Sequence, residues 1–105
     1  MNLTDNELAI MRALWSAPRP LTRKEIVATS AALRCKRRTV YVLLNGLVAK
    51  GMIYVAGYMY NGEHSSRVFV PALSQVEYTA KIVATLLPAE KYDDLFHLLG
   101  TSCTD

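Results

Sequence analysis

Apolar residues recur at helical spacing in three segments of the first half of the chain. The first segment spans about residues 5–16 and is followed by two prolines, and the second spans about residues 23–33. The third follows a short linker at residues 34–35 and ends at Lys50-Gly51, a pair that is typical of a helix C-terminus. The pattern therefore predicts three helices. The apolar side of the third helix consists of Val40, Leu43, Leu44, Leu47 and Val48.

The same helix-start signal occurs three times, at residues 3–8, 21–26 and 73–78. Each copy has a leucine, then a threonine or serine, and a glutamate three residues after the hydroxyl residue. In such a capping box the hydroxyl oxygen accepts from one amide N–H and the glutamate accepts from another, while flanking apolar residues pack together. The first two copies mark the first two helices, and the third predicts that helical structure resumes near residue 75.

The periodicity changes after the third helix. Residues 53–60 are rich in β-branched and aromatic residues, Asn61-Gly62 is a turn signal, and residues 67–70 are a second strand-forming run before Pro71. This pattern predicts a β-hairpin with a polar tip. Three helices followed by a hairpin give the element order of a winged helix-turn-helix domain, which we place in residues 1–72.

Residues 73–105 predict two further helices, at about residues 75–87 and 90–99. The first carries two apolar stripes roughly 130 degrees apart on a helical wheel, and packing on the chain's own domain covers only one of them. We therefore expect a symmetric homodimer through these helices; the alternative is that they fold back onto each other within one chain. The fold class is mainly α with a small β-hairpin, a winged helix-turn-helix followed by a C-terminal two-helix dimerisation region. The expected dimer contacts are Val76, Tyr78, Ile82, Val83, Leu86, Leu87, Tyr92, Leu95, Phe96 and Leu99.

Composition excludes several classes of protein. The chain has 105 residues, of which 51% are hydrophobic and 20% charged, as is typical of one globular unit rather than a disordered or collagen-like chain. Its apolar runs are too short to cross a bilayer and it shows no secretory signal, so we expect a cytoplasmic protein without membrane insertion. The sequence has two separated cysteines and shows no paired carboxylates or glycine-rich phosphate loop. We therefore expect no catalytic residues, no metal and no cofactor.

Charge is unevenly distributed along the chain. Residues 12–50 hold nine basic residues against one acidic residue, whereas residues 74–105 have a net charge of −3. A basic segment followed by an acidic one is typical of a part that binds a polyanion joined to a part that avoids it. A solvated basic face is the alternative interpretation of the charge alone.

The third helix carries the candidate chemistry. Opposite its apolar side lie Arg38, Tyr41, Val42, Asn45 and Ala49, a face without acidic residues. In the major groove of DNA, Arg38 can bind a guanine, Asn45 an adenine, and Val42 a thymine methyl group, although Val42 is equally well explained as ordinary exposed surface. The cations expected to bind phosphates, including one near the wing tip, are Arg23, Lys24, Lys36, Arg37 and Arg67.

The sequence also resembles that of a known family. The shared pattern is Leu3-Thr4-x-x-Glu7-x-x-Ile10-Met11-x-x-Leu14-Trp15, then Leu21-Thr22-x-x-Glu25-Ile26, then Thr39-Val40-x-x-Leu43-Leu44-x-x-Leu47-Val48-x-Lys50-Gly51-Met52-Ile53. Over about residues 3–72 the chain resembles the penicillinase and methicillin-resistance repressors. The resemblance implies a bacterial winged-helix homodimer that represses transcription from a palindromic operator in double-stranded DNA, with release in many members through a membrane sensor and proteolysis. It also implies that Thr39 and Tyr41 contact DNA bases.

Two residues depart from the family pattern. Val42 stands where the family usually has a threonine, and Gly46 stands where an arginine or lysine is common. The operator of this chain therefore need not be the family's. The main functional hypothesis is a sequence-specific DNA-binding repressor, and the alternative is a winged-helix interaction module that docks on an acidic protein partner.

Overall fold

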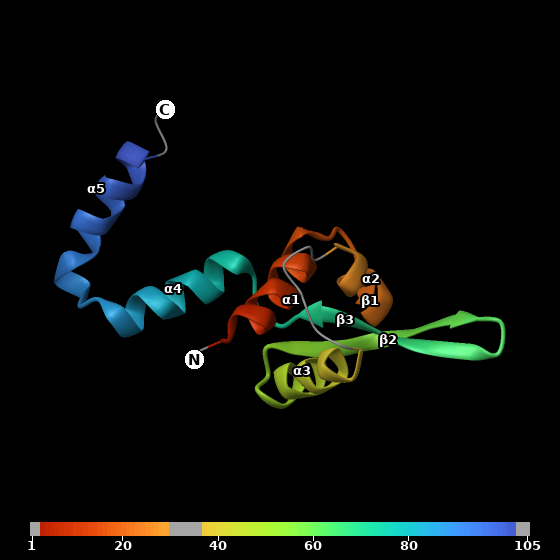
Figure 1. Cartoon of the computed structure of the whole chain (residues 1–105). Helices are drawn as coiled ribbons and strands as arrows, with labels where there is room; N and C mark the ends of the chain where they lie inside the picture. Colours follow the sequence, from red (N-terminus) through yellow and green to blue (C-terminus); the bar gives the residue numbers. More distant parts are fainter. Residues whose placement is uncertain (1–2, 30–36, 103–105) are drawn as a thin grey trace. The chain divides into compact units, whose positions relative to one another are not determined.

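The computed structural model describes residues 3–29 and 37–102, which fall into two compact units (Figure 1). The first unit ends at Gln75 and the second begins at Val76. The first contains α1 (Asp5–Ser16), β1 (Leu21–Thr22), α2 (Arg23–Thr29), α3 (Arg37–Ala49), β2 (Ile53–Asn61) and β3 (His64–Pro71). The second contains α4 (Gln75–Leu86), the 3-10 turn η1 (Ala89–Lys91) and α5 (Tyr92–Ser102).

Three helices followed by a hairpin confirm the predicted winged helix-turn-helix fold, and two helices follow it as expected. Figure 1 shows the hairpin of β2 and β3 extending beyond the three helices of its unit. The predicted end of the second helix, at residue 33, lies outside the described residues. The predicted end of the last helix at residue 99 was wrong, since α5 continues through Gly100 to Ser102.

The core of the first unit lies between the three helices and the sheet. Its fully buried side chains come from every one of these elements and include Ile10, Met11, Ile26, Val40, Leu44, Leu47, Ile53 and Phe69. On α1, Met11 and Leu14 are buried, whereas Leu8 and Trp15 are only half-buried. Trp15 lies at the edge because its indole N–H donates to the Leu73 carbonyl oxygen at 2.9 Å.

The end of α3 is a glycine cap, as the sequence predicted. Gly51 has φ +76°, its amide donates to the Val48 carbonyl oxygen at 3.0 Å, and the Met52 amide donates to that of Leu47 at 3.0 Å. This pair of hydrogen bonds forms a Schellman motif, which satisfies carbonyl groups that the helix leaves without partners. The cap ends α3 at Ala49 and directs the chain into β2.

The sheet has the order β1-β3-β2 and is antiparallel throughout. The two-residue strand β1 was not predicted; Leu21 pairs with Phe69 on β3, and so the start of α2 is attached to the sheet. The predicted Asn61-Gly62 turn signal lies at the end of the hairpin, and the centre of the turn is one residue further on. Asn61 pairs with His64, and the turn centre is therefore Gly62 and Glu63. Gly62 has φ +67° and Glu63 does not have positive φ, as in a type II′ hairpin, where glycine comes first.

A β-bulge in β2 determines which wing side chains face the helices. Val55 pairs with Phe69, but Gly57 pairs with Val68 and Tyr58 with Arg67, so that Ala56 is an extra residue. Alternate residues of β3 share a face, and Tyr58 therefore lies on the same face as Arg67 and Phe69. Without the bulge, residue 57 would occupy that place, and it is a glycine without a side chain.

The capping box at the start of α1 also binds the end of α3. The Glu7 amide donates to Thr4 Oγ1 at 3.2 Å, and Glu7 Oε1 accepts from the Thr4 amide at 3.0 Å. Its second oxygen, Oε2, accepts from Lys50 Nζ at 2.7 Å. Burial raises the pKa of Glu7, but the hydrogen bonds from Lys50 and Thr4 outweigh it, so its pKa lies below the ordinary value.

The capping box at the start of α2 repeats this arrangement. Glu25 Oε1 accepts from the Thr22 amide at 2.9 Å, and its Oε2 accepts from the Arg19 guanidinium. The hydrogen bond from Arg19, assisted by that from the Thr22 amide, lowers the pKa of Glu25 to about 2. Two cations of the basic segment, Arg19 and Lys50, are therefore neutralised locally by the glutamates of the helix-start signals.

We expect Glu7→Gln to lower the free energy of unfolding at neutral pH by about 1 to 2 kcal/mol, because the Lys50 ammonium loses its carboxylate partner. A carboxyl whose pKa is lowered by folding stabilises the protein above its unfolded pKa, and this contribution is lost as pH falls through the folded pKa. Urea denaturation across pH should therefore show the difference between wild type and variant shrinking as pH falls below the ordinary glutamate pKa of 4.5 and vanishing below the lowered pKa of the folded state. Glu63→Gln, at the exposed wing turn, is the matched control. A difference that persists unchanged in acid would contradict this assignment.

We expect Gly46→Ala to raise the free energy of unfolding by about 1 kcal/mol, because glycine costs helix stability and an added Cβ would meet nothing within 4 Å. Thermal denaturation measures the change. Gly62→Ala is the opposing control, since a side chain at φ +67° is strained and should destabilise the hairpin. A destabilising Gly46→Ala would show that this position in α3 requires glycine.

Candidate nucleic-acid interface

The exposed face of α3 is separated cleanly from its buried face. Val40, Leu44 and Leu47 are at most 1% exposed, whereas Tyr41 is 40% and Val42 68% exposed. All five residues expected to read bases lie on the exposed face of this helix, and these are Arg38, Thr39, Tyr41, Val42 and Asn45. The predicted core residues Leu43 and Val48 are half-buried, at the boundary between the two faces. The 13-residue sequence of α3 contains no acidic residue, so its outer face is neutral to cationic.

A groove of about 470 Å³ lies beside this face, between the helices and the wing. It is lined by residues from α2, α3, β2 and β3, namely Arg23, Lys24, Tyr41, Tyr58, His64, Ser65, Ser66, Arg67 and Phe69. Three of these are cations and none is a carboxylate. Hydroxyl groups from serine and tyrosine add hydrogen-bond donors, so the lining suits a ligand with anionic oxygens.

One cation of the groove contacts a side chain on the exposed face of α3. The Arg23 guanidinium lies 4.8 Å from the centre of the Tyr41 ring, in cation–π geometry. Arg23 is the first residue of α2, which the Thr22–Glu25 capping box holds in place. The contact therefore connects the start of α2 to the exposed side of α3. Sequence reasoning assigned Arg23 to phosphate binding and missed this contact, which depends on how the two helices pack.

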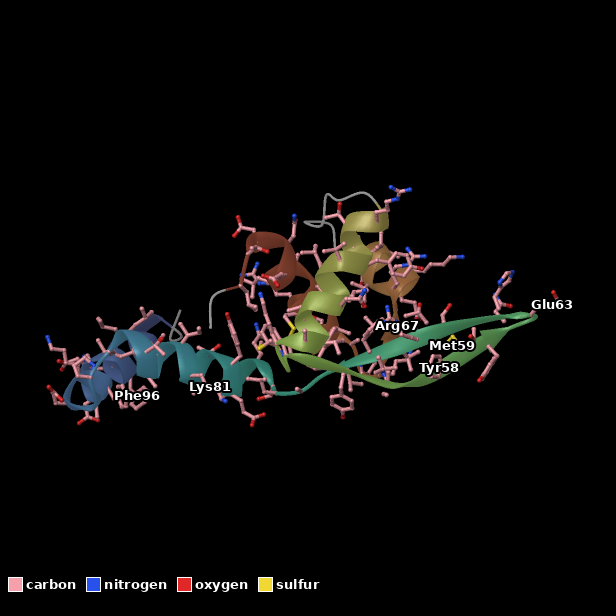
Figure 2. All side chains as sticks on the ribbon, turned by 90° about the horizontal axis from the view of Figure 1, so that it is seen from below. Tyr58, Met59, Glu63, Arg67, Lys81 and Phe96 are labelled. Atoms are coloured by element: carbon pink, nitrogen blue, oxygen red, sulfur yellow. The ribbon has the colours of Figure 1, made fainter. Side chains whose placement is uncertain are left out.

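A second cation joins the wing to α3. Arg67 Nη1 donates to Asn45 Oδ1 at 3.1 Å, and the same guanidinium lies 5.1 Å from the centre of the Phe69 ring. Figure 2 labels Arg67 and Tyr58 on the wing strands and Glu63 at their turn. Arg67 was expected just after the wing tip, but it pairs with Tyr58, three pairs from the Asn61–His64 pair that flanks the turn. A residue expected to bind phosphate and one expected to read a base are thus hydrogen-bonded to each other.

The remaining predicted phosphate contacts are only partly described. Lys24 is exposed and lines the groove. Lys36 lies outside the described residues, as does the side chain of Arg37, the first residue of α3. His64 also lines the groove, from the first position of β3. Within residues 3–29 and 37–102, no group of three or more metal-ligating side chains is placed to hold an ion.

The second unit leaves its apolar side chains uncovered. Of the residues expected at a dimer interface, four are exposed, with Val76 at 78%, Leu86 at 77%, Phe96 at 60% and Leu99 at 51%. The others are half-buried, and these are Tyr78, Ile82, Val83, Leu87, Tyr92 and Leu95. Leu98, at 64%, was missed although it continues the same apolar pattern. No residue of α4, and none of α5 whose side chain is described, is buried.

None of the described helices is both long enough and apolar enough to span a bilayer.

A search of curated proteins returned no significant match to the sequence. Comparison with protein families gave one result that covers most of the chain. Residues 3–95 match the family described as penicillinase repressor, a span that includes the winged helix, α4 and the start of α5. The resemblance predicted from residues 3–72 is confirmed and extended, and the chain belongs to the penicillinase repressor family of transcriptional regulators.

Proposed function

We propose that the chain is a sequence-specific DNA-binding repressor that acts as a homodimer on a palindromic operator. The observation that carries this proposal is the acid-free, exposed face of α3 beside a groove lined by three cations. An α-helix fits the major groove of B-DNA, and a cationic groove beside it suits the phosphates that flank the contacted bases. We assign DNA binding to residues 1–72 and dimerisation to residues 73–105.

The contacts divide into two kinds. Base reading falls to the exposed face of α3, where Arg38 can place two N–H donors on a guanine and Val42 can contact a thymine methyl group. Thr39, Tyr41 and Asn45 complete the base-reading set. Phosphate binding falls to the cations around this face, which are Arg23, Lys24, Lys36, Arg37 and Arg67.

The homodimer is supported by the second unit. Its two helices bury none of the described side chains, and their apolar residues include Leu86 and Phe96, which are mostly exposed. Exposed apolar surface on this scale is typical of an interface. A two-fold interface would place two copies of α3 on the two half-sites of a palindrome. From family membership alone we also propose that a membrane sensor protease can act on the chain to end repression.

An acidic protein is the second candidate partner, because the groove and the 68% exposed Val42 offer it cations and an apolar contact. Selection of binding sites from a random duplex DNA library distinguishes the two. Enrichment of one palindromic sequence by the isolated chain supports the repressor. Failure to enrich any sequence favours the protein partner.

We expect Lys24→Ala to weaken binding to every duplex by the same factor, because a phosphate contact carries no sequence information. Fluorescence anisotropy across a salt series should show the slope of log affinity against log salt falling by about 0.9. Lys81→Ala, which removes the same charge from α4, is the control and should leave the slope unchanged (Figure 2). Equal slopes for wild type and both variants would contradict phosphate binding by the groove.

We expect the wild-type chain to sediment at twice its mass of 11.7 kDa, and Phe96→Glu to sediment as a monomer. A carboxylate in an apolar interface loses its hydration without gaining a partner. The control is Tyr54→Glu, since Tyr54 is similarly exposed, at 54%, but lies on the wing. Analytical ultracentrifugation at micromolar concentration measures all three. A monomeric wild type would refute the dimer, and with it the palindrome.

A further inference from the structure

We propose that Arg67 of the wing is a specificity-determining residue, because it holds the Asn45 side-chain amide of α3 in one orientation. The inference rests on the proposed DNA-binding function and adds a property to it. Base preference opposite Asn45 would then be determined jointly by the recognition helix and the wing, although the two residues are 22 positions apart in the sequence.

The Arg67 guanidinium is positioned by the core. Phe69, two residues along β3 on the same face, is 1% exposed, and pairs with Leu21 on one side and Val55 on the other. Its ring therefore has a fixed place in the centre of the sheet. The guanidinium lies 5.1 Å from the centre of that ring, and the backbone of Arg67 is held by its pairing with Tyr58. Arg67 thus reaches α3 from a rigid support.

The chemistry of the two groups determines the amide orientation. A guanidinium has donors only, so the Asn45 atom that faces Arg67 Nη1 at 3.1 Å must be the acceptor, Oδ1. The Nδ2 group, with its two N–H donors, then points away from Arg67. Asn45 is exposed, so these donors are available to a ligand. Oδ1 keeps a second lone pair, but both N–H donors face outward, so in the free chain Asn45 is prepared chiefly to donate.

This orientation changes the base that Asn45 is expected to read. Adenine presents an acceptor and a donor in the major groove, and an asparagine reads it by donating to N7 while accepting from N6. Guanine presents two acceptors, N7 and O6. Because Arg67 engages Oδ1, Asn45 offers its donors and favours guanine. Asn45 alone, as considered from the sequence, would favour adenine.

The decisive experiment compares base preferences of four chains: wild type, Arg67→Met, Asn45→Ala and the double variant. Methionine keeps a long, unbranched and uncharged side chain at this position while removing the guanidinium. Sites are first selected by wild type from a random duplex library, and the Asn45 position is the base pair at which Asn45→Ala loses discrimination. At that position Arg67→Met should shift the guanine-to-adenine affinity ratio about fivefold toward adenine. In the Asn45→Ala background the same substitution should cause no shift.

The control for lost charge is Lys24→Ala, which should weaken binding to all four bases alike. If Arg67→Met does the same, Arg67 is only a phosphate contact and the inference is overturned. It is overturned equally if the shift persists without Asn45, or if Asn45→Ala loses discrimination nowhere. Failure of the proposed function is a different result, in which the wild-type chain selects no sequence at all.

A second measurement needs no DNA. In the free protein, nuclear magnetic resonance should show the Asn45 side-chain amide as ordered in wild type, with a changed shift and greater mobility in Arg67→Met. The backbone amide spectrum of the same sample reports whether the variant is folded. An Asn45 amide signal that is unchanged in a folded Arg67→Met chain would show that the contact does not orient Asn45.

Discussion

Burial of one side of α3 is the constraint on which the rest of the domain depends. Val40, Leu44 and Leu47 are at most 1% exposed, on a helix that packs against α1 and β2. Since a helix has fixed angular spacing, this packing also determines which residues face outward. The Gly51 cap ends the helix, and Lys50 binds Glu7 at the start of α1. Contacts on the buried side therefore fix where α3 ends and which of its residues face outward. A ligand on the exposed face would not touch these contacts.

Pairing within the basic segment concentrates its free charge near this face. Arg19 and Lys50 are bound by Glu25 and Glu7, whose remaining oxygens complete helix caps. Each glutamate thereby satisfies backbone donors and neutralises a cation. Other cations, including Lys24, line the groove between the helices and the wing. The glutamates of the helix-start signals therefore pair with two cations that do not line the groove, while Arg23, Lys24 and Arg67 do line it.

The parts of the fold that were predictable are those that depend on short-range patterns. Helical periodicity, the capping boxes of α1 and α2 and the Lys50-Gly51 terminus each involve residues within a few positions, and these predictions are confirmed. What the sequence did not reveal depends on strand register. The Ala56 bulge and the turn at Gly62 together decide that Arg67 lies opposite Tyr58 and beside α3. No local pattern distinguishes that register from one shifted by a residue, so the sequence placed Arg67 only as just after the wing tip. The C-terminal helices illustrate a different limit, since the pattern that predicts them does not say what covers their exposed apolar residues, such as Phe96 at 60%.

Register also governs the part that we propose for the wing in DNA recognition. A wing that merely supplied charge would tolerate a shift of one residue, because phosphate binding demands little geometric precision. Here such a shift would turn Arg67 to the opposite face of the sheet and separate it from both Phe69 and Asn45. The bulge is what allows Tyr58, rather than Gly57, to lie beside Arg67 in the groove. An irregularity in one strand therefore connects the packing of the core to the chemistry at the surface of α3.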